Sequence, residues 1–215
     1  MQSYVVHFVR HGLTKANING KFAGSGDLPL CDEGIEKLKK LSEDFEYPRA
    51  CEYYSSPMKR CTETCKILYP EAEPKIVDGF RECVFSGTDG LRDDPDGEAK
   101  VETWQEIQKR VTTTFDTVVE SMMRRGVTSA TIFTHGGVIM TLLYCYGLPK
   151  AEFLDWMVDN GCGYSVRITP GLWMRDKMFE VYDKIPRGAD VSLSRQIRDL
   201  INDINNDGRK EEKNE

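Results

Sequence analysis

The fold is decided by the stretch Tyr4-Val5-Val6-His7-Phe8-Val9-Arg10-His11-Gly12. Its first six residues are apolar, aromatic or β-branched apart from one histidine, which is typical of a buried strand. A cation and an imidazole follow directly, and Gly12 lets the backbone turn sharply after them. We therefore expect a buried strand that carries Arg10 and His11 at its carboxyl end.

A second apolar stretch ends in a similar way. The run Ala130-Thr131-Ile132-Phe133 predicts another strand, and it leads into Thr134-His135-Gly136-Gly137. We expect a helix to begin at the two glycines, which places His135 at a helix amino terminus. Free N–H groups at such a terminus favour an anion.

The remaining pattern alternates helices with strands. Expected helices cover 32–45, 56–68, 101–125 and 191–204, and further strands lie near 52–54, 163–169 and 178–182. Ser56 should cap the second helix, with Pro57 in its first turn. The order implies one α/β domain over 1–206, with a mainly parallel central sheet and helices on both faces. A loop is expected over 88–100, and the charged tail 207–215 is expected to be disordered.

Composition narrows the class of protein. The chain has 215 residues and a net charge of −6, which argues against a general nucleic-acid binder. No apolar run is long enough for a membrane span, and the amino terminus lacks the features of a signal peptide. The seven cysteines include no CxxC pair, so we expect reduced thiols and a cytoplasmic protein.

The chain contains only three histidines. His7 lies inside the first strand and is expected to be a packed structural residue. A strand advances about 3.3 Å per residue, so His7 and His11 would be roughly 13 Å apart and could not share a metal ion. Ligands of parallel sheets bind at the carboxyl ends of strands, which leaves His11 and His135 as the functional candidates.

Together these stretches resemble the histidine phosphatase superfamily, also called the phosphoglycerate mutase-like family. The resemblance covers roughly residues 4–147, and within the family it is strongest to the short phosphatases that include α-ribazole phosphatase. Four motifs occur in the family's order: Arg10-His11-Gly12 with Thr14 and Asn17, Ser55-Ser56-Pro57-Met58-Lys59-Arg60, Arg81-Glu82, and His135-Gly136-Gly137.

The resemblance implies a phosphate pocket and a nucleophile. His11 matches the nucleophile, and a neutral imidazole nitrogen can attack phosphorus. The other implied phosphate ligands are Arg10, Arg60, His135, Gly136, Thr14 and Asn17. The two imidazoles should then lie within about 8 Å of each other, because one phosphate offers oxygens only within hydrogen-bond reach. No metal and no cofactor are expected.

The resemblance also implies a proton carrier. Glu82 matches the general acid that protonates the leaving alkoxide and then activates water against phosphohistidine. A carboxylate beside bound phosphate should have a raised pKa, which suits this task. We interpret Arg81 as a structural partner of this segment.

Three positions depart from the family pattern. Cys31 stands where a threonine N-cap is common, so Asp32 is expected to cap that helix. Leu13 replaces an acidic residue, and Met140 replaces an arginine that relatives carry after the His-Gly-Gly turn. None of these positions has a role in the implied chemistry.

Three functions remain open at this point. The first is a hydrolase of small phosphomonoesters such as α-ribazole phosphate, sugar phosphates or phosphoserine, with no nucleic-acid or membrane partner. The second is a mutase, which the acidic segment after Glu82 disfavours because a mutase needs basic groups for a second anion. The third is a phosphate sensor without catalysis, which would have no use for Glu82. Specificity is expected to come from Lys21-Phe22-Ala23 and from 83–101, and the oligomeric state stays open.

Overall fold

The computed structural model describes residues 2–21, 23, 24, 26–84 and 101–189. The helix expected over 191–204, the loop expected over 88–100 and the tail 207–215 lie outside these residues. So does Phe22 in one of the two expected specificity segments.

Within the described ranges, the strands form one seven-stranded sheet in the order β3-β2-β4-β1-β6-β7-β5. β1 pairs in parallel with β4, β4 with β2, and β2 with β3, whereas β6 runs antiparallel to both of its neighbours. The mainly parallel sheet is therefore confirmed. The strand bounds are β1 Tyr4–Arg10, β2 Glu52–Ser55, β3 Lys75–Ile76, β4 Ser129–Thr134, β5 Gly147–Leu148, β6 Gly163–Ile168 and β7 Phe179–Ile185.

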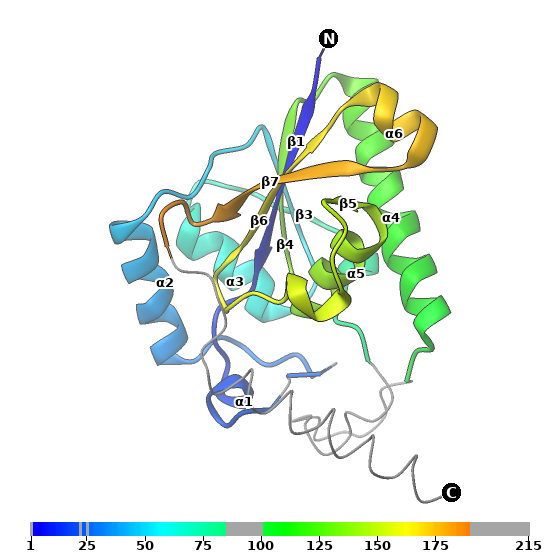
Figure 1. Cartoon of the computed structure of the whole chain (residues 1–215). Coiled ribbons are helices and arrows are strands. Elements are labelled where there is room, and N and C mark those ends of the chain that lie inside the picture. The colour runs from blue at the N-terminus through cyan, green and yellow to red at the C-terminus, as the bar shows by residue number, and fades with distance from the viewer. Residues whose placement is uncertain (1, 22, 25, 85–100, 190–215) are drawn as a thin grey trace, which may run out of the picture.

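Helices cover both faces of this sheet, as expected. In Figure 1, α2 and α3 lie on one side of the strands, and α4, α5 and α6 lie on the other. The α-helices are α1 Lys15–Ile18, α2 Asp32–Asp44, α3 Lys59–Leu68, α4 Trp104–Arg125, α5 Gly136–Tyr146 and α6 Pro170–Asp176, and two 3-10 helices cover Asp78–Phe80 (η1) and Phe153–Trp156 (η3). None of the helices in the described part is long and apolar enough to cross a membrane.

Two expected helix caps are wrong. α3 begins at Lys59 with Met58 as its N-cap, so Ser56 and Pro57 precede the helix. The hydroxyl of Ser56 is 2.8 Å from Nε2 of His135, and it accepts only a long hydrogen bond, 3.4 Å, from the amide of the N-cap residue Met58. The N-cap of α2 is Cys31 rather than Asp32, and its thiol donates to the carbonyl of Leu13.

Several elements differ in extent from the expectation. α4 begins at Trp104 because Thr103 and Glu106 form a capping box, so the helix does not include Val101, where it was expected to begin. β7 continues to Ile185, three residues beyond the expected end. α1, α6, β3 and β5 were not expected, because each is too short to show a hydrophobic period.

The strand β1 is the buried centre of the molecule. The ring of Phe8 packs 5.5 Å from that of Phe115 on α4, and both side chains are fully buried. β6 runs so close on the other edge that a Cβ at Gly163 would lie 1.7 Å from the carbonyl oxygen of Phe8. Packing on both faces and pairing on both edges thus fix the position where β1 ends.

Candidate active site

The carboxyl ends of three strands meet at one edge of the sheet. Arg10 on β1 stands opposite Thr134 on β4, and the amide of His11 donates to the Thr134 carbonyl at 2.9 Å. The amide of Ser56, after β2, donates to the carbonyl of Phe133 at 2.9 Å. Hydrogen bonds between backbones therefore place His11, His135 and Ser56 side by side.

The two imidazoles expected to share a ligand are neighbours. Their ring centroids lie 5.2 Å apart with an interplanar angle of 63°, so the prediction of a separation within 8 Å is confirmed. His11 is 2% exposed and His135 is fully buried. His135 precedes α5 as its N-cap, which confirms its expected place at a helix amino terminus.

The tautomer of His11 follows from its hydrogen bond. Its Nδ1 lies 2.7 Å from the carbonyl oxygen of Gly12, and a carbonyl can only accept, so Nδ1 carries the proton. Burial, reinforced by the charges of Arg60 and Arg10, holds the pKa of His11 well below its usual value. The ring is therefore neutral, and its Nε2 keeps a free lone pair.

Gly12 has a different purpose from the one expected. Its φ lies outside the left-handed region, so the sharp turn does not require glycine there. What glycine supplies is space, because a Cβ at this position would lie 2.6 Å from Cδ1 of Leu38. The close packing of α2 brings the Gly12 carbonyl to the place where it fixes His11.

Two buried arginines lie around the imidazoles. Arg10 donates from Nη1 to the carbonyl of Val158 at 2.6 Å, and Arg60 donates to the carbonyls of Gly24 and Gly26 at 2.9 and 2.6 Å. Among the described residues, the Nε of each arginine is buried without a partner. A buried cation with an unpaired donor is unfavourable, and an oxyanion would satisfy both groups.

The start of α5 contributes further donors to the same place. The first helical N–H groups have no intrahelical partner, and they include those of Gly136 and Gly137. The guanidinium of Arg10 passes over this turn, with Nε 3.5 Å from where a Cβ at Gly136 would stand. A helix amino terminus and a guanidinium thus converge, which is the charge pattern of an anion site.

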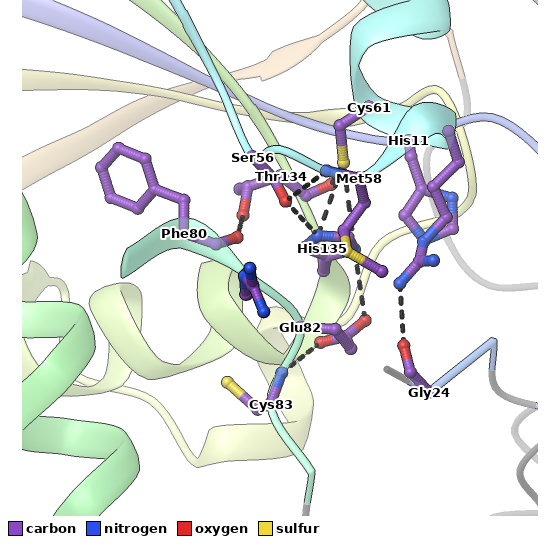
Figure 2. Close-up of polar contacts among 12 residues, drawn as sticks. His11, Gly24, Ser56, Met58, Cys61, Phe80, Glu82, Cys83, Thr134 and His135 are labelled. Carbon is purple, nitrogen blue, oxygen red and sulfur yellow. Dashed lines mark hydrogen bonds and ion pairs between the residues drawn. The ribbon is translucent and has the colours of Figure 1, made fainter. Parts of the chain in front are cut away.

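Glu82 completes the cluster from a separate segment. Its Oε2 is 3.6 Å from Nδ1 of His135, and its Oε1 accepts from the amide of Cys83 at 2.9 Å. Figure 2 shows Glu82 and Ser56 on opposite sides of His135. Burial raises the pKa of Glu82, against the opposing charge of Arg60. Such a carboxyl group can hold a proton and release it within the site.

Thr14 and Asn17 lie nearby but contact each other first. They form the capping box of α1, in which the Thr14 amide and hydroxyl both donate to Oδ1 of Asn17 at 3.1 Å. Nδ2 of Asn17 donates to the carbonyl of Lys21 at 3.4 Å, a long bond. Their direct contact with a phosphate therefore stays a prediction.

The residues interpreted as structural lie apart from this cluster. His7 is 4% exposed, with Nδ1 2.8 Å from the hydroxyl of Ser165, and burial lowers its pKa to about 4. Arg81 is exposed and pairs with Asp78 at 2.7 Å. Both observations agree with the structural roles expected for them.

The sequence patterns did not indicate Asn160, which binds the backbone of His11, the candidate nucleophile. The side chain is 2% exposed and donates from Nδ2 to the carbonyls of His11 and Gly12 at 3.0 and 3.3 Å. It also reaches Oδ1 of Asn17 at 3.4 Å. The only signal in the sequence is its place just before a strand, between an aspartate and a glycine, which is typical of a turn.

The cluster could also be interpreted as a metal site. Ligand atoms of His11, Glu82 and His135 lie within 4.8 Å of one another, and two imidazoles with a carboxylate are common zinc ligands. However, the charges of Arg10 and Arg60 act on both imidazoles. A further positive charge would be repelled here, so the site is better suited to an anion.

Comparison with known proteins identifies the class that this fold and site define. The sequence model of the histidine phosphatase superfamily (branch 1) matches residues 6–180. The chain therefore belongs to the histidine phosphatase superfamily, which includes both phosphatases and mutases.

Individual relatives differ in what their names say. The chain is similar to the "uncharacterized phosphatase PhoE" of Bacillus subtilis, with 26% identity over 180 residues, 78% of this chain and 90% of the relative. It is 31% identical over 80 residues to a 2,3-bisphosphoglycerate-dependent phosphoglycerate mutase of Nautilia profundicola. That match spans only 36% of this chain and 35% of the mutase.

Solved structures show the same fold at lower identity. An alpha-ribazole phosphatase from Shigella flexneri matches with a TM-score of 0.65 and 18% identity, over 88% of this chain and 99% of that one. A phosphoglycerate mutase from Bacillus anthracis matches with a TM-score of 0.68 and 18% identity, over 84% and 92%. These likenesses support the fold and do not choose between the two activities.

Proposed function

We propose that the protein hydrolyses small phosphomonoesters, without a metal ion, through a phosphate bound covalently to His11. The observation that carries this proposal is the fixed neutral tautomer of His11 between buried arginines. A nucleophile must offer a lone pair, and Nε2 offers one because Nδ1–H is held by the Gly12 carbonyl. The cations that would bind the phosphate are also the ones that help to keep His11 deprotonated.

The first step forms a bond from Nε2 of His11 to phosphorus. The bond from phosphorus to the substrate oxygen breaks, and the proton of Glu82 goes to the leaving alkoxide. Arg10, Arg60 and neutral His135 stabilise the charge on the other three phosphoryl oxygens. Glu82 then takes a proton from water, and the hydroxide displaces His11 from phosphorus. Inorganic phosphate leaves, and both residues return to their starting states.

A hydrolase fits this chain better than a mutase. Mutase action requires cations for a second anionic group of the substrate and exclusion of water. The sequence after Glu82 contains Asp89, Asp93, Asp94 and Asp96 but only one arginine before Lys100. Acidic residues would repel a phosphorylated carboxylic acid, whereas a neutral or cationic alcohol portion would be tolerated.

Quenching with alkaline detergent during turnover of p-nitrophenyl phosphate, which preserves a phosphate bound to histidine, tests the proposal most directly. We expect release of p-nitrophenol, one acid-labile phosphate per chain, and its loss in His11→Ala. Binding of phosphate without any turnover would instead support the alternative function of a non-catalytic phosphate sensor. Phosphate passed to an added alcohol in preference to water would support the mutase.

A metal requirement is tested separately with EDTA. We expect unchanged turnover after dialysis against the chelator, because Arg10 and Arg60 supply the positive charge that a metal would otherwise supply. Activity that disappears and returns only with added Zn²⁺, Mn²⁺ or Mg²⁺ would show that the His11, Glu82 and His135 cluster holds an ion. A screen of phosphorylated metabolites would then identify the substrate.

A further inference from the structure

Arg110 on α4 contacts the chain on both sides of Glu82, through backbone carbonyls before it and through the thiol of Cys83 after it. Its Nη1 donates to the carbonyls of Gly79 and Arg81 at 2.9 and 3.1 Å. Its Nη2 lies 3.9 Å from the thiol sulfur of Cys83. The residues directly before and after Glu82 are therefore in contact with one guanidinium, although Arg110 is 28 positions away along the chain.

The same guanidinium also holds the chain that returns toward α4. Nε and Nη2 form a bidentate ion pair with Glu102 at 2.7 and 2.6 Å, and the amide of Glu102 donates to the Val84 carbonyl at 2.9 Å. These contacts join residues 79–84 to residue 102. The planar fork of an arginine can make all of them at once, and a lysine cannot.

Among the described residues, the carboxylate of Glu82 has few other contacts that fix its position. It follows the short helix η1 and lies in neither a helix nor a strand. Its carboxylate accepts one backbone hydrogen bond, from the adjacent Cys83, and faces His135 at 3.6 Å. A bond to the neighbouring residue moves with the segment, so the segment must be anchored from elsewhere.

We propose that Arg110 is a positioning residue that holds Glu82 at the distance from the phosphate at which it can pass its proton to the leaving group. This inference rests on the proposed function. Arg110 does not touch the reacting atoms, and it acts by fixing the backbone that carries the acid. Its loss should therefore affect the step that needs a proton and spare the attack by His11.

The test compares Arg110→Met with Arg125→Met, which lies near the other end of the same helix. Arg125 forms a bidentate ion pair with Glu52 of the same kind, far along α4 from Glu82. We expect Arg110→Met to slow hydrolysis of an alkyl phosphate by about 10- to 100-fold, the loss that a displaced catalytic group brings. Hydrolysis of p-nitrophenyl phosphate should slow much less, and Arg125→Met should change neither rate.

A double variant separates positioning from a general loss of structure. In Glu82→Gln the acid is already absent, so adding Arg110→Met should slow the alkyl substrate no further. Arg110→Lys keeps the charge but loses the fork, and we expect the same selective loss from it if the methionine variant does not fold. Equal losses on both substrates, or additive losses in the double variant, would overturn the inference. Failure of the proposed function would show differently, as no turnover and no phosphohistidine in the wild type.

Discussion

The histidines and the carboxylate of the candidate site are held by two different kinds of structure. His11 and His135 follow β1 and β4, which pair over six residues and are buried on both faces. Glu82 lies in the segment 78–84, which is held by side chains of Arg110 and Thr134 and by a backbone hydrogen bond from Glu102 to Val84. The histidine part is thus fixed by the sheet, and the carboxylate part by a few hydrogen bonds.

This difference predicts that substitutions in the two parts of the site change the rate of hydrolysis in two different ways. A change on the histidine side should affect attack on phosphorus, whatever the leaving group is. A change on the carboxylate side should affect only substrates whose leaving group needs a proton. Comparing an alkyl phosphate with an aryl phosphate therefore reports which part of the site a substitution has reached.

His11→Ala should have the largest effect. It removes the atom that forms the bond to phosphorus, so turnover of both substrates and the trapped phosphate should disappear. Substitution of His7, the buried histidine within β1, serves as the matched control and should leave turnover intact. If hydrolysis by His11→Ala stayed within about tenfold of the wild type, the nucleophile would have to be another group.

Glu82→Gln should have the next largest effect, and a selective one. Alkyl phosphate hydrolysis should slow by about 10² to 10⁴, the usual contribution of a positioned proton donor. The aryl ester should slow less, because p-nitrophenolate leaves without a proton. Binding of inorganic phosphate should hold or tighten, since a negative charge beside the anion is lost. Equal losses accompanied by weaker phosphate binding would mean that Glu82 is structural.

Asn160→Ala should slow attack by His11 on the alkyl and the aryl phosphate to the same extent. The amide of Asn160 supports the carbonyls of His11 and Gly12, and the second of these fixes the His11 ring. We expect both substrates to slow by about 10- to 100-fold, as for a nucleophile slightly out of place.

The neighbouring Asp159→Asn is the control for Asn160. It breaks the partly buried ion pair with Lys37 and keeps an oxygen to accept the Asn160 amide, so its rates should match the wild type. Selective loss on the alkyl ester alone in Asn160→Ala would place the residue with Glu82 instead of with His11.

The sheet-bound part of the site could be predicted from the sequence because its cause is local. A buried strand ends where Arg10, His11 and the glycine begin, and the same holds for β4 and His135. Parallel pairing then brings the two ends together without any further information. The expected contact between imidazoles was therefore a consequence of two short patterns.

The supporting residues could not be predicted in this way. Asn160 contacts His11 across 149 positions of sequence, and Arg110 contacts Arg81 across 29; neither belongs to a periodic pattern at the site. Ser56 has the sequence of a helix cap, yet its hydroxyl lies against His135. Short-range rules describe what a residue can do locally, and tertiary contacts decided otherwise at these positions.

The smallest effect on activity is expected at His7, where the change concerns stability instead. Burial, followed by the charge of Arg187, lowers the pKa of His7 to about 4, whereas an unfolded histidine has a pKa near 6.5. Between these values the unfolded chain binds a proton that the native protein does not, so the free energy of unfolding should fall as the pH falls through this window. This loss of stability amounts to about 3 kcal/mol and reaches its full size only at a pH below both pKa values. The variant His7→Asn can still reach Ser165. The free energy of unfolding, measured with urea, should differ less between pH 7 and pH 4.5 in this variant than in the wild type. Turnover at pH 7 should stay the same. Parallel pH curves for the two proteins would show that His7 takes up its proton in the native state as readily as in the unfolded chain.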